Sequence, residues 1–387
     1  MLSLSEAIHA ALEQNPSYQG IRSRARAAEG LTYQSGLWEN PVLFGESEEW
    51  PTGESFEESR YIFGISQTVP FPGKKRLDRA AALKEEDSRK ETSKSARIEL
   101  IRRVRVAFYQ VLASEMLVEV SERLFSLANS SVETAKERLD AGVSTAQEVL
   151  RAEVQAQRVK NSKIGFERSL KIARSNLALA IGHPERTDIQ VTGKLSEEIP
   201  KDLLNFDEEQ ILNHHPRVLA AEALVQRSIA LKDRAELEPY PDITLSVAGG
   251  RREVNDETLV DFGFSIPLPI LDSSKGNVLA ASEDQRRAKS GLTGVKQTLK
   301  TELANKGEML QQTAEQVKNY RERLIPQSEK ALRMVQTGFR EGEYGFNDLL
   351  DTQRTVAEAR IEYLRVLFAL NKSIAEVKSL TVLNETF

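Results

Sequence analysis

The chain has 387 residues, of which 40% are hydrophobic, 6% aromatic and 29% charged, and its formal net charge is -5. Positive and negative side chains are interspersed and form no basic face, so we expect no nucleic-acid partner. There is no cysteine, which excludes disulfides and thiol catalysis. Long runs rich in Ala, Leu, Glu, Lys, Arg and Gln predict a protein made mainly of long helices.

The first residues, Met1 to Leu4, lack the basic and apolar regions of a signal peptide. No stretch of the sequence reaches the roughly 18 apolar residues of a membrane-spanning helix. If the protein is exported, we expect its signal peptide to be absent from this sequence.

The first predicted elements are a helix over about residues 4–36 and two strands over about 41–50 and 59–69. Ser5 is placed to cap the helix, and Pro16 interrupts it. After the helix, apolar residues change from helical spacing to the alternation of a strand. The polar residues between the two strands favour a hairpin loop.

Pro70 and Pro72 end the second strand, because proline cannot continue a sheet ladder. The next residues, about 74–140, contain no proline and predict one helix of roughly 100 Å at 1.5 Å per residue. Apolar side chains recur along it at the three-four spacing of a coiled-coil seam. A turn at Gly142 leads to a helix over about 146–181, so the two helices predict a long antiparallel hairpin.

The second half of the chain repeats this order, with Asp207 placed as the first helix cap. Its predicted elements are a helix over about 206–238, strands over about 241–251 and 257–267, and helices over about 274–340 and 346–380.

Residues that mark backbone breaks recur 200 positions apart. The pairs are Pro16 and Pro216, Pro41 and Pro241, and Gly142 and Gly342. Residues 1–200 and 201–387 are therefore predicted to be two structural repeats that together form one continuous domain.

Strands of about ten residues are long enough to cross a bilayer as barrel staves, but four strands leave open edges that lipid does not tolerate. Three copies of the chain would supply twelve strands and close a barrel around a lumen. The alternative, an ordinary sandwich core, needs more sheet than four strands provide. The side chains expected to face lipid are Tyr61, Phe63, Ile65, Phe262, Phe264 and Ile266.

Over residues 4–380 the chain resembles the TolC-like outer-membrane factors of Gram-negative tripartite efflux and secretion systems. The resemblance rests on the twofold repeat, on the corner from Ile65 to Arg76, and on the turns within 138–150 and 339–351. The corner is most similar to that of the CzcC and CusC heavy-metal efflux branch.

The resemblance implies a mainly α fold with a small β part, in which a trimeric 12-stranded outer-membrane β-barrel is continued by an α-helical barrel in the periplasm. It implies a passive exit duct, with heavy-metal cations as a candidate substrate. The implied partners are two further copies, outer-membrane lipid, a periplasmic adaptor protein and an inner-membrane RND-type pump. It implies no enzymatic activity, and we expect no cofactor. The scattered methionines and the four histidines indicate no metal site.

The resemblance also places a periplasmic gate just after the second tip turn, at Asp348 and Asp351. Three copies would bring six carboxylates near one axis, where they would favour cations. Tyr344 stands where relatives often have a basic residue, and Arg340 is the candidate substitute. The alternative is that the two aspartates only cap a helix and favour its positive end.

The two tips are expected to contact the adaptor, again because of the resemblance. The residues are Leu139, Ala141, Gly142, Val143, Gly342 and Glu343. The alternative is that the glycines only end helices in the left-handed conformation.

The basic run from Lys74 to Arg76 begins a helix, where the helix dipole disfavours cations. We expect anionic lipid headgroups to compensate it, with a solvated charge run as the alternative.

A soluble coiled-coil scaffold or interaction protein is the competing hypothesis. It explains the three-four spacing, but it does not explain membrane-length strands at equivalent places in both halves. We find no nucleophile with its base, no metal cluster and no glycine-rich phosphate loop, so an enzyme is not expected.

Overall fold

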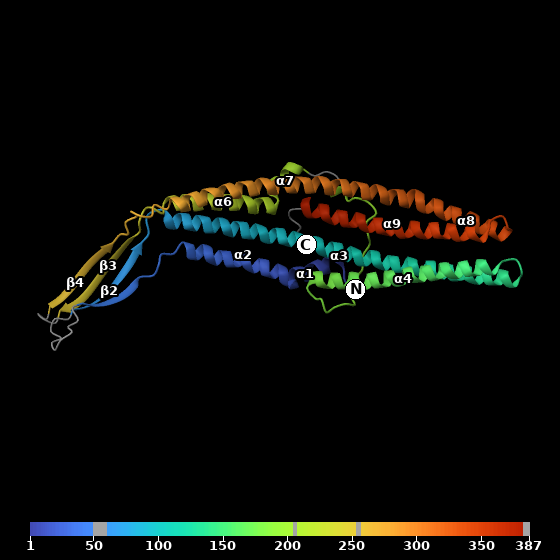
Figure 1. Ribbon diagram of the computed structural model, residues 1–387, viewed down its shortest axis with the longest axis horizontal. Helices are drawn as coiled ribbons and strands as arrows, with labels where there is room; N and C mark the ends of the chain where they lie inside the picture. The colour runs from blue at the N-terminus through green and yellow to red at the C-terminus, as the bar shows by residue number, and fades with distance from the viewer. Residues whose placement is uncertain (49–59, 204–206, 253–256, 382–387) are drawn as a thin grey trace. The chain divides into compact units, whose positions relative to one another are not determined.

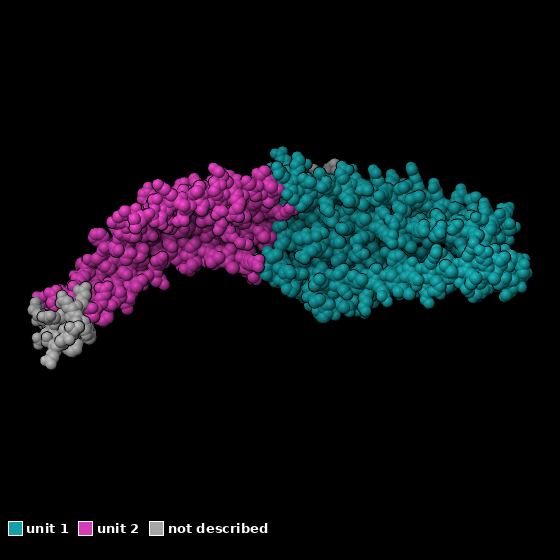
Figure 2. Space-filling model, in the orientation of Figure 1, with its two compact units in different colours: residues 1–21, 94–215, 297–387 teal, residues 22–93, 216–296 magenta. Residues whose placement is uncertain are grey.

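The computed structural model describes residues 1–48, 60–203, 207–252 and 257–381 (Figure 1). The chain forms two compact units, coloured separately in Figure 2. Unit 1 comprises Met1–Ile21, Lys94–His215 and Gln297–Phe387, and unit 2 comprises Arg22–Ser93 and Pro216–Lys296. Each unit therefore draws on both halves of the sequence.

The first half follows the order helix, hairpin, helix, helix. Its elements are α1 (Leu4–Gln14), α2 (Pro16–Ser35), β1 (Val42–Glu48), β2 (Arg60–Val69), α3 (Lys74–Asp140) and α4 (Ala146–Ile181). The end of the predicted strand 41–50 and the hairpin loop after it lie outside the described residues.

The second half has the same order with additional short helices. Its elements are η2 (Lys201–Leu203), α5 (Glu208–His214), α6 (Pro216–Glu236), β3 (Ile243–Arg252), β4 (Glu257–Ser265), α7 (Lys275–Asn319), η3 (Tyr320–Leu324), α8 (Ile325–Glu341) and α9 (Phe346–Thr381). Among the described residues, none of these helices combines the length and apolar character that crossing a membrane requires.

The helix caps differ between the two halves. Asp207 caps α5, as predicted, and its carboxylate accepts the N–H groups of Glu209 and Gln210. The cap of α1 is Ser3 and not the predicted Ser5. Ser3 and Glu6 form a capping box, in which the Glu6 carboxylate accepts the Ser3 N–H at 2.8 Å.

The predicted helix 274–340 is divided in the structure by the π-helical turn η3. Pro326 has no N–H and cannot donate to the carbonyl four residues before it. The chain adjusts just before this proline, where the Ile325 N–H donates to the carbonyl of Tyr320, five residues earlier.

The strands of unit 2 form one antiparallel sheet in the order β1-β2-β3-β4 (Figure 1). The central pair, β2 and β3, joins the two halves of the chain, with Ile65 opposite Val247. Ile65 is also opposite Leu43 of β1, and Val247 is opposite Phe262 of β4. Within the described residues, β1 and β4 are the two open edges of this sheet.

Three apolar clusters hold unit 1 together. One joins α1 to α3 and α4 around Ile8, Phe108 and Leu177. The second joins both helical hairpins near their tips, and the third packs α9 on α7 and η2. The apolar seam predicted from three-four spacing is therefore shared among several helices.

Candidate channel surfaces

The sheet has one apolar face that is exposed within the chain. Directly opposed residues of antiparallel strands share a face, so the pairing of Leu43, Ile65, Val247 and Phe262 places all four together. The exposed apolar side chains on this face are Leu43, Phe63, Ile65, Ile243, Leu245, Val247, Val260, Phe262 and Phe264. They span all four strands.

Five of the six residues predicted to face lipid lie on this surface. Tyr61 is there but half-buried, and Ile266 lies just beyond the last residue of β4. Sequence reasoning left out the apolar residues of β1 and β3. Their signal was the alternation of Leu245 and Val247 with small residues along β3.

The opposite face of the sheet carries mainly small and polar side chains, and its apolar members are Val42, Phe44, Ile62 and Leu259. Ser66 lies opposite Ser246, and the hydroxyls of Thr68 and Thr244 are 3.1 Å apart. An ion pair joins Arg60 of β2 to Asp261 of β4 on this face. A sheet with one apolar and one mainly polar face suits a boundary between lipid and water.

The first corner, residues 70–74, is anchored to the segment just before β3. The ring of Phe71 stacks on Tyr240 with centroids 4.8 Å apart, and the Phe71 N–H donates to Asp242 Oδ1 at 2.7 Å. Lys74 Nζ lies 2.9 Å from the same oxygen, and its side chain is only 6% exposed. The expected lipid headgroup is therefore wrong for Lys74, because a carboxylate of the chain compensates its charge.

The second corner, residues 266–274, has no such anchor among the described residues. Leu268, Ile270 and Leu271 are 72%, 79% and 101% exposed. The carbonyl of Ser274 accepts the Val278 N–H at 3.1 Å. Ser274 itself has a φ of 53°. Gly73 fills the equivalent place in the first corner with a φ of 100°. Both corners need a left-handed residue, but only the first uses glycine.

The first tip, in unit 1, joins α3 to α4. Gly142 has a φ of 75°, and the Val143 N–H donates to the Arg138 carbonyl at 2.9 Å, which closes the end of α3. Leu139, Ala141 and Val143 are exposed around this turn. The backbone turn is thus complete by itself and presents small and apolar side chains to its surroundings.

The second tip joins α8 to α9 with the same backbone. Gly342 has a φ of 84°, and the Glu343 N–H donates to the Gly338 carbonyl at 2.7 Å. The ring of Tyr344 covers Gly338 so closely that no Cβ would fit there. Arg340 is exposed.

Asp348 and Asp351, the two aspartates predicted to form a gate, are both exposed in the first turns of α9, and both have partners there. Asp348 Oδ2 accepts the Gly345 N–H at 2.9 Å, which is the arrangement of a helix cap. Asp351 Oδ1 lies 3.3 Å from Arg354. Asp348 is held by a neutral group and Asp351 by a cation, so Asp348 keeps more of its negative field.

The tips are joined side by side within unit 1 by contacts that sequence reasoning missed. Arg151 of α4 donates to Asn347 Oδ1 of α9 at 2.7 Å. The guanidinium carbon of Arg138 lies 4.7 Å from the centroid of the Phe339 ring. These partners are about 200 residues apart, and nothing in the local sequence pairs them.

A second polar network fastens the segment after α4 to the helices of the second half. The Glu197 carboxylate accepts a hydrogen bond from Tyr363 at 2.8 Å and one from Arg321 of η3 at 3.1 Å. These donors lower the pKa of Glu197, and burial together with Glu197 raises the pKa of Tyr363. Buried Asn371 adds two hydrogen bonds to the backbone of Ser196, each 2.8 Å.

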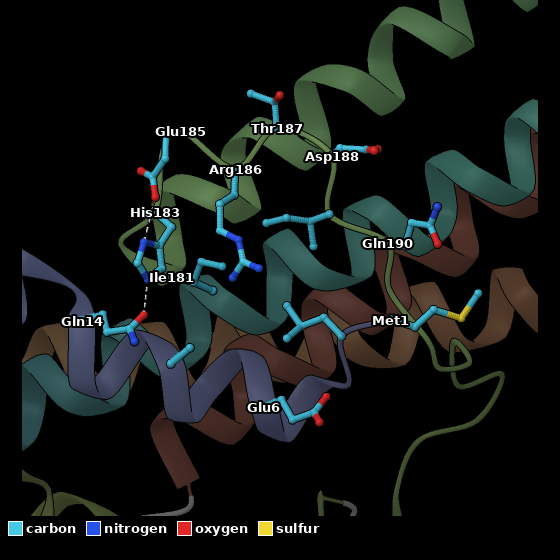
Figure 3. Close-up of a pocket in the computed structure, with 13 residues that line it drawn as sticks. Met1, Glu6, Gln14, Ile181, His183, Glu185, Arg186, Thr187, Asp188 and Gln190 are labelled. Carbon is cyan, nitrogen blue, oxygen red and sulfur yellow. Dashed lines mark hydrogen bonds and ion pairs between the residues drawn. The ribbon is translucent and has the colours of Figure 1, made fainter.

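The end of α4 lines a pocket with α1 and the N-terminal residues (Figure 3). His183 is hydrogen-bonded to Glu185 at 2.9 Å and to Gln14. The pKa of Glu185 is lowered by a hydrogen bond to its own backbone and by His183. In the described ranges, no group of three or more His, Asp or Glu side chains could hold a metal ion.

Comparison with known proteins gives one family over nearly the whole chain. The sequence profile described as outer membrane efflux protein matches residues 7–183 and 209–381. The cobalt-zinc-cadmium resistance protein CzcC of Cupriavidus metallidurans is 25% identical over 366 residues, which is 95% of this chain and 86% of CzcC.

Two solved structures have the same fold. The structure of CusC superposes with a TM-score of 0.86 at 16% identity, covering 98% of this chain and 91% of CusC. The outer membrane protein VceC of Vibrio cholerae superposes with a TM-score of 0.83 at 20% identity, covering 98% of this chain and 96% of VceC.

Proposed function

The chain belongs to the outer membrane efflux protein family and is a channel component of a tripartite efflux system, and we propose that three copies form its passive exit duct for heavy-metal cations. The channel role follows from the family. The trimer, the barrel, the periplasmic tube, the gate and the substrate are the parts that we propose.

The observation that carries the trimer is the four-stranded sheet with two different faces and two open edges. Its apolar face fits lipid, and its mainly polar face fits a water-filled lumen. Open edges are not tolerated in lipid, so β4 of one copy must pair with β1 of the next. Three copies then give a closed barrel of twelve strands, a size consistent with an aqueous lumen.

We assign the barrel to the outer membrane and the two helical hairpins of each copy to a tube in the periplasm. The side chains that we propose to face lipid are those of the apolar face of the sheet. They include the predicted Tyr61, Phe63, Ile65, Phe262 and Phe264. A soluble scaffold would leave this apolar surface in water without a function.

The helical tips are the proposed contact with the adaptor, and through it with an RND-type pump. Leu139 and Val143 are exposed at the first tip, and Gly342 and Glu343 are exposed at the second. Both turns satisfy their own backbone hydrogen bonds. Their exposed side chains are therefore free to make contacts with a partner.

The periplasmic gate is proposed at Asp348 and Asp351, with Asp348 the stronger contributor. Three copies would place Asp348 carboxylates around one axis without a cation of their own helix to offset them. Arg354 offsets Asp351. Arg340 and Tyr344 complete the proposed gate, although Tyr344 lies against its own helix at Gly338.

The halves 1–200 and 201–387 are proposed to be structural repeats. The same sequence of elements, helix then two strands then two long helical segments, supports this division. The compact units divide the chain differently because the strands and helices of both repeats pack together.

The substrate proposal rests on similarity to a protein named for cobalt, zinc and cadmium resistance. The test is complementation of a Gram-negative host that lacks its own metal-efflux channel but retains the pump and adaptor. Expression of this chain fused to the signal peptide of a known outer-membrane protein should lower cellular cobalt, zinc and cadmium and restore growth in these metals. Restored export of an organic compound with no effect on metal content would contradict the metal assignment.

A second variant tests the proposed role of the tips. Gly142→Ala together with Gly342→Ala is assayed for export and for its amount in the outer membrane. If this variant accumulates normally and fails to export, the tips matter for coupling to the pump. If it does not accumulate, export cannot be compared and the single variants replace it.

A further inference from the structure

The second corner carries a group of exposed apolar side chains outside the sheet face in unit 2. Leu268, Ile270 and Leu271 point three apolar side chains away from the chain. The corner follows β4, one of the two open edges. A strand that pairs with β4 at this edge would therefore bring its own flanking residues next to the corner.

A second exposed apolar pair lies at the other open edge. Leu37 and Trp38 are 40% and 55% exposed and come just before β1, which begins at Val42. Glu39 is exposed beside them, and Lys275 is exposed beside the second corner. The second corner also carries exposed Asp272, so its charges are mixed and the apolar side chains carry the comparison.

Strand directions bring these two patches together when copies associate. Successive strands of the sheet are antiparallel, so β1 and β4 run in opposite directions. If β4 of one copy pairs with β1 of the next, that pair is antiparallel as well. The end of β4 then lies beside the start of β1 of the neighbouring copy.

The chain already contains this contact between two of its own strands. The corner that follows β2 packs on the segment that precedes β3, through the stack of Phe71 on Tyr240 and the carboxylate of Asp242. The corner that follows β4 has no later strand of its own to pack on. In a barrel closed by β4 and the next copy's β1, residues 36–41 of that copy would occupy the corresponding place.

We propose that Leu268, Ile270 and Leu271 of one copy pack on Leu37 and Trp38 of the next copy, as an apolar seam at the foot of each intersubunit strand pair. The proposal rests on the proposed closure of a barrel by identical chains. Lipid is a poorer occupant, because this corner contains two prolines and irregular backbone, which hydrocarbon does not tolerate.

The chain has no cysteine, so an introduced pair reports a single contact. Trp38→Cys with Leu271→Cys, oxidised in membranes or detergent, should give covalent dimers and trimers that disappear on reduction. The matched control is Trp38→Cys with Leu279→Cys, because Leu279 is also exposed but lies eight residues farther along the chain. Equal cross-linking by the control pair would overturn the seam.

Two further measurements separate the seam from the trimer itself. If native mass shows a trimer but the 38–271 pair does not cross-link, the seam is wrong and the proposed function stands. If the protein is a monomer, both are wrong. Leu271→Asp should lower the temperature at which the trimer dissociates by several degrees, with Leu279→Asp as the control, and equal melting of both variants would contradict the seam.

Fluorescence quenching shows whether lipid, instead of the next copy, covers Trp38. In a Trp50→Phe background, Trp38 is the remaining tryptophan. Brominated acyl chains should leave its fluorescence nearly unchanged if the next copy covers it. Strong quenching would place Trp38 in lipid and overturn the proposal.

Discussion

The two corners at the foot of the sheet share a backbone turn and differ in what surrounds them. The first is enclosed by its own chain, with Phe71 on Tyr240 and Lys74 on Asp242. The second leaves Leu268, Ile270 and Leu271 exposed. We attribute the difference to position: the first corner lies in the middle of the sheet, and the second lies at an edge that another copy completes.

The two tips also share a backbone turn and differ in their side-chain contacts. Gly142 and Gly342 form equivalent left-handed turns. The following helix begins with Glu148 hydrogen-bonded to Ser144 in the first half, and with Asp348 bonded to the Gly345 N–H in the second. The repeat thus conserves backbone breaks, while the side chains differ where each half has its own neighbours.

The largest expected effect comes from removing the anchor of the first corner. Asp242→Ala leaves Lys74 nearly buried without its carboxylate and the Phe71 N–H without its acceptor. Losing a fully buried partner costs about 3–5 kcal/mol. Asp242 is 35% exposed, so with solvent screening we expect about 2 kcal/mol, measured by thermal unfolding in detergent.

The matched variant in the second corner is Asp272→Ala, which removes the acceptor of the Ser274 N–H at 2.8 Å. This corner is exposed and carries no buried lysine, so the loss should be below about 1 kcal/mol. Equal losses in the two corners would contradict the comparison.

The next effect concerns the left-handed residue in each corner. Gly73→Ala should destabilise by about 1–2 kcal/mol, because a Cβ disfavours a φ of 100°. Ser274→Gly relieves the same strain at a φ of 53° and should raise the melting temperature slightly. A lower melting temperature for Ser274→Gly would show that the serine side chain contributes more than its strain costs.

At the second tip, charge can be separated from helix capping. Asp348→Asn keeps an oxygen that can accept the Gly345 N–H, so it should remove charge with little change in stability. We expect a lower preference for cations in bilayer recordings, and a smaller change for Asp351→Asn, whose charge Arg354 already offsets. If neither variant changes selectivity or conductance, the pair is only a helix cap.

The smallest expected effect is a pH dependence in the segment that connects the halves. The pKa of Glu197 is lowered from its ordinary value of 4.5 by Tyr363 and Arg321, so its stabilisation is complete above that value. It is lost as the pH falls below 4.5 through the folded pKa. Hydrogen exchange around Ser196 should rise in that window, and Glu197→Gln should abolish the rise.

Much of the fold could be predicted because proline, glycine and apolar spacing act locally. Pro70, Pro72 and Gly142 mark breaks that the structure also has, and alternation along β2 and β3 identifies strands. The π turn before Pro326 could not be placed, because proline predicts a disturbance but not the hydrogen bonding that accommodates it. Ser3 was missed because two nearby serines both suit a cap.

The contacts that define the site were harder to predict. Asp242 lies 168 residues from Lys74, and Asn347 lies 196 from Arg151, so no local pattern pairs them. The residues of the apolar face could be identified only from the strand register, because Leu43 and Val247 lie beside Ile65 through strand pairing. Local rules therefore predict elements, and long-range packing decides their partners.

The central claim is that copies of this chain form a membrane duct, and single-channel recording in a planar bilayer tests it most directly. Purified protein in detergent should insert and give discrete openings that favour cations. Protein that stays monomeric without detergent and never raises the conductance of the bilayer would contradict the claim.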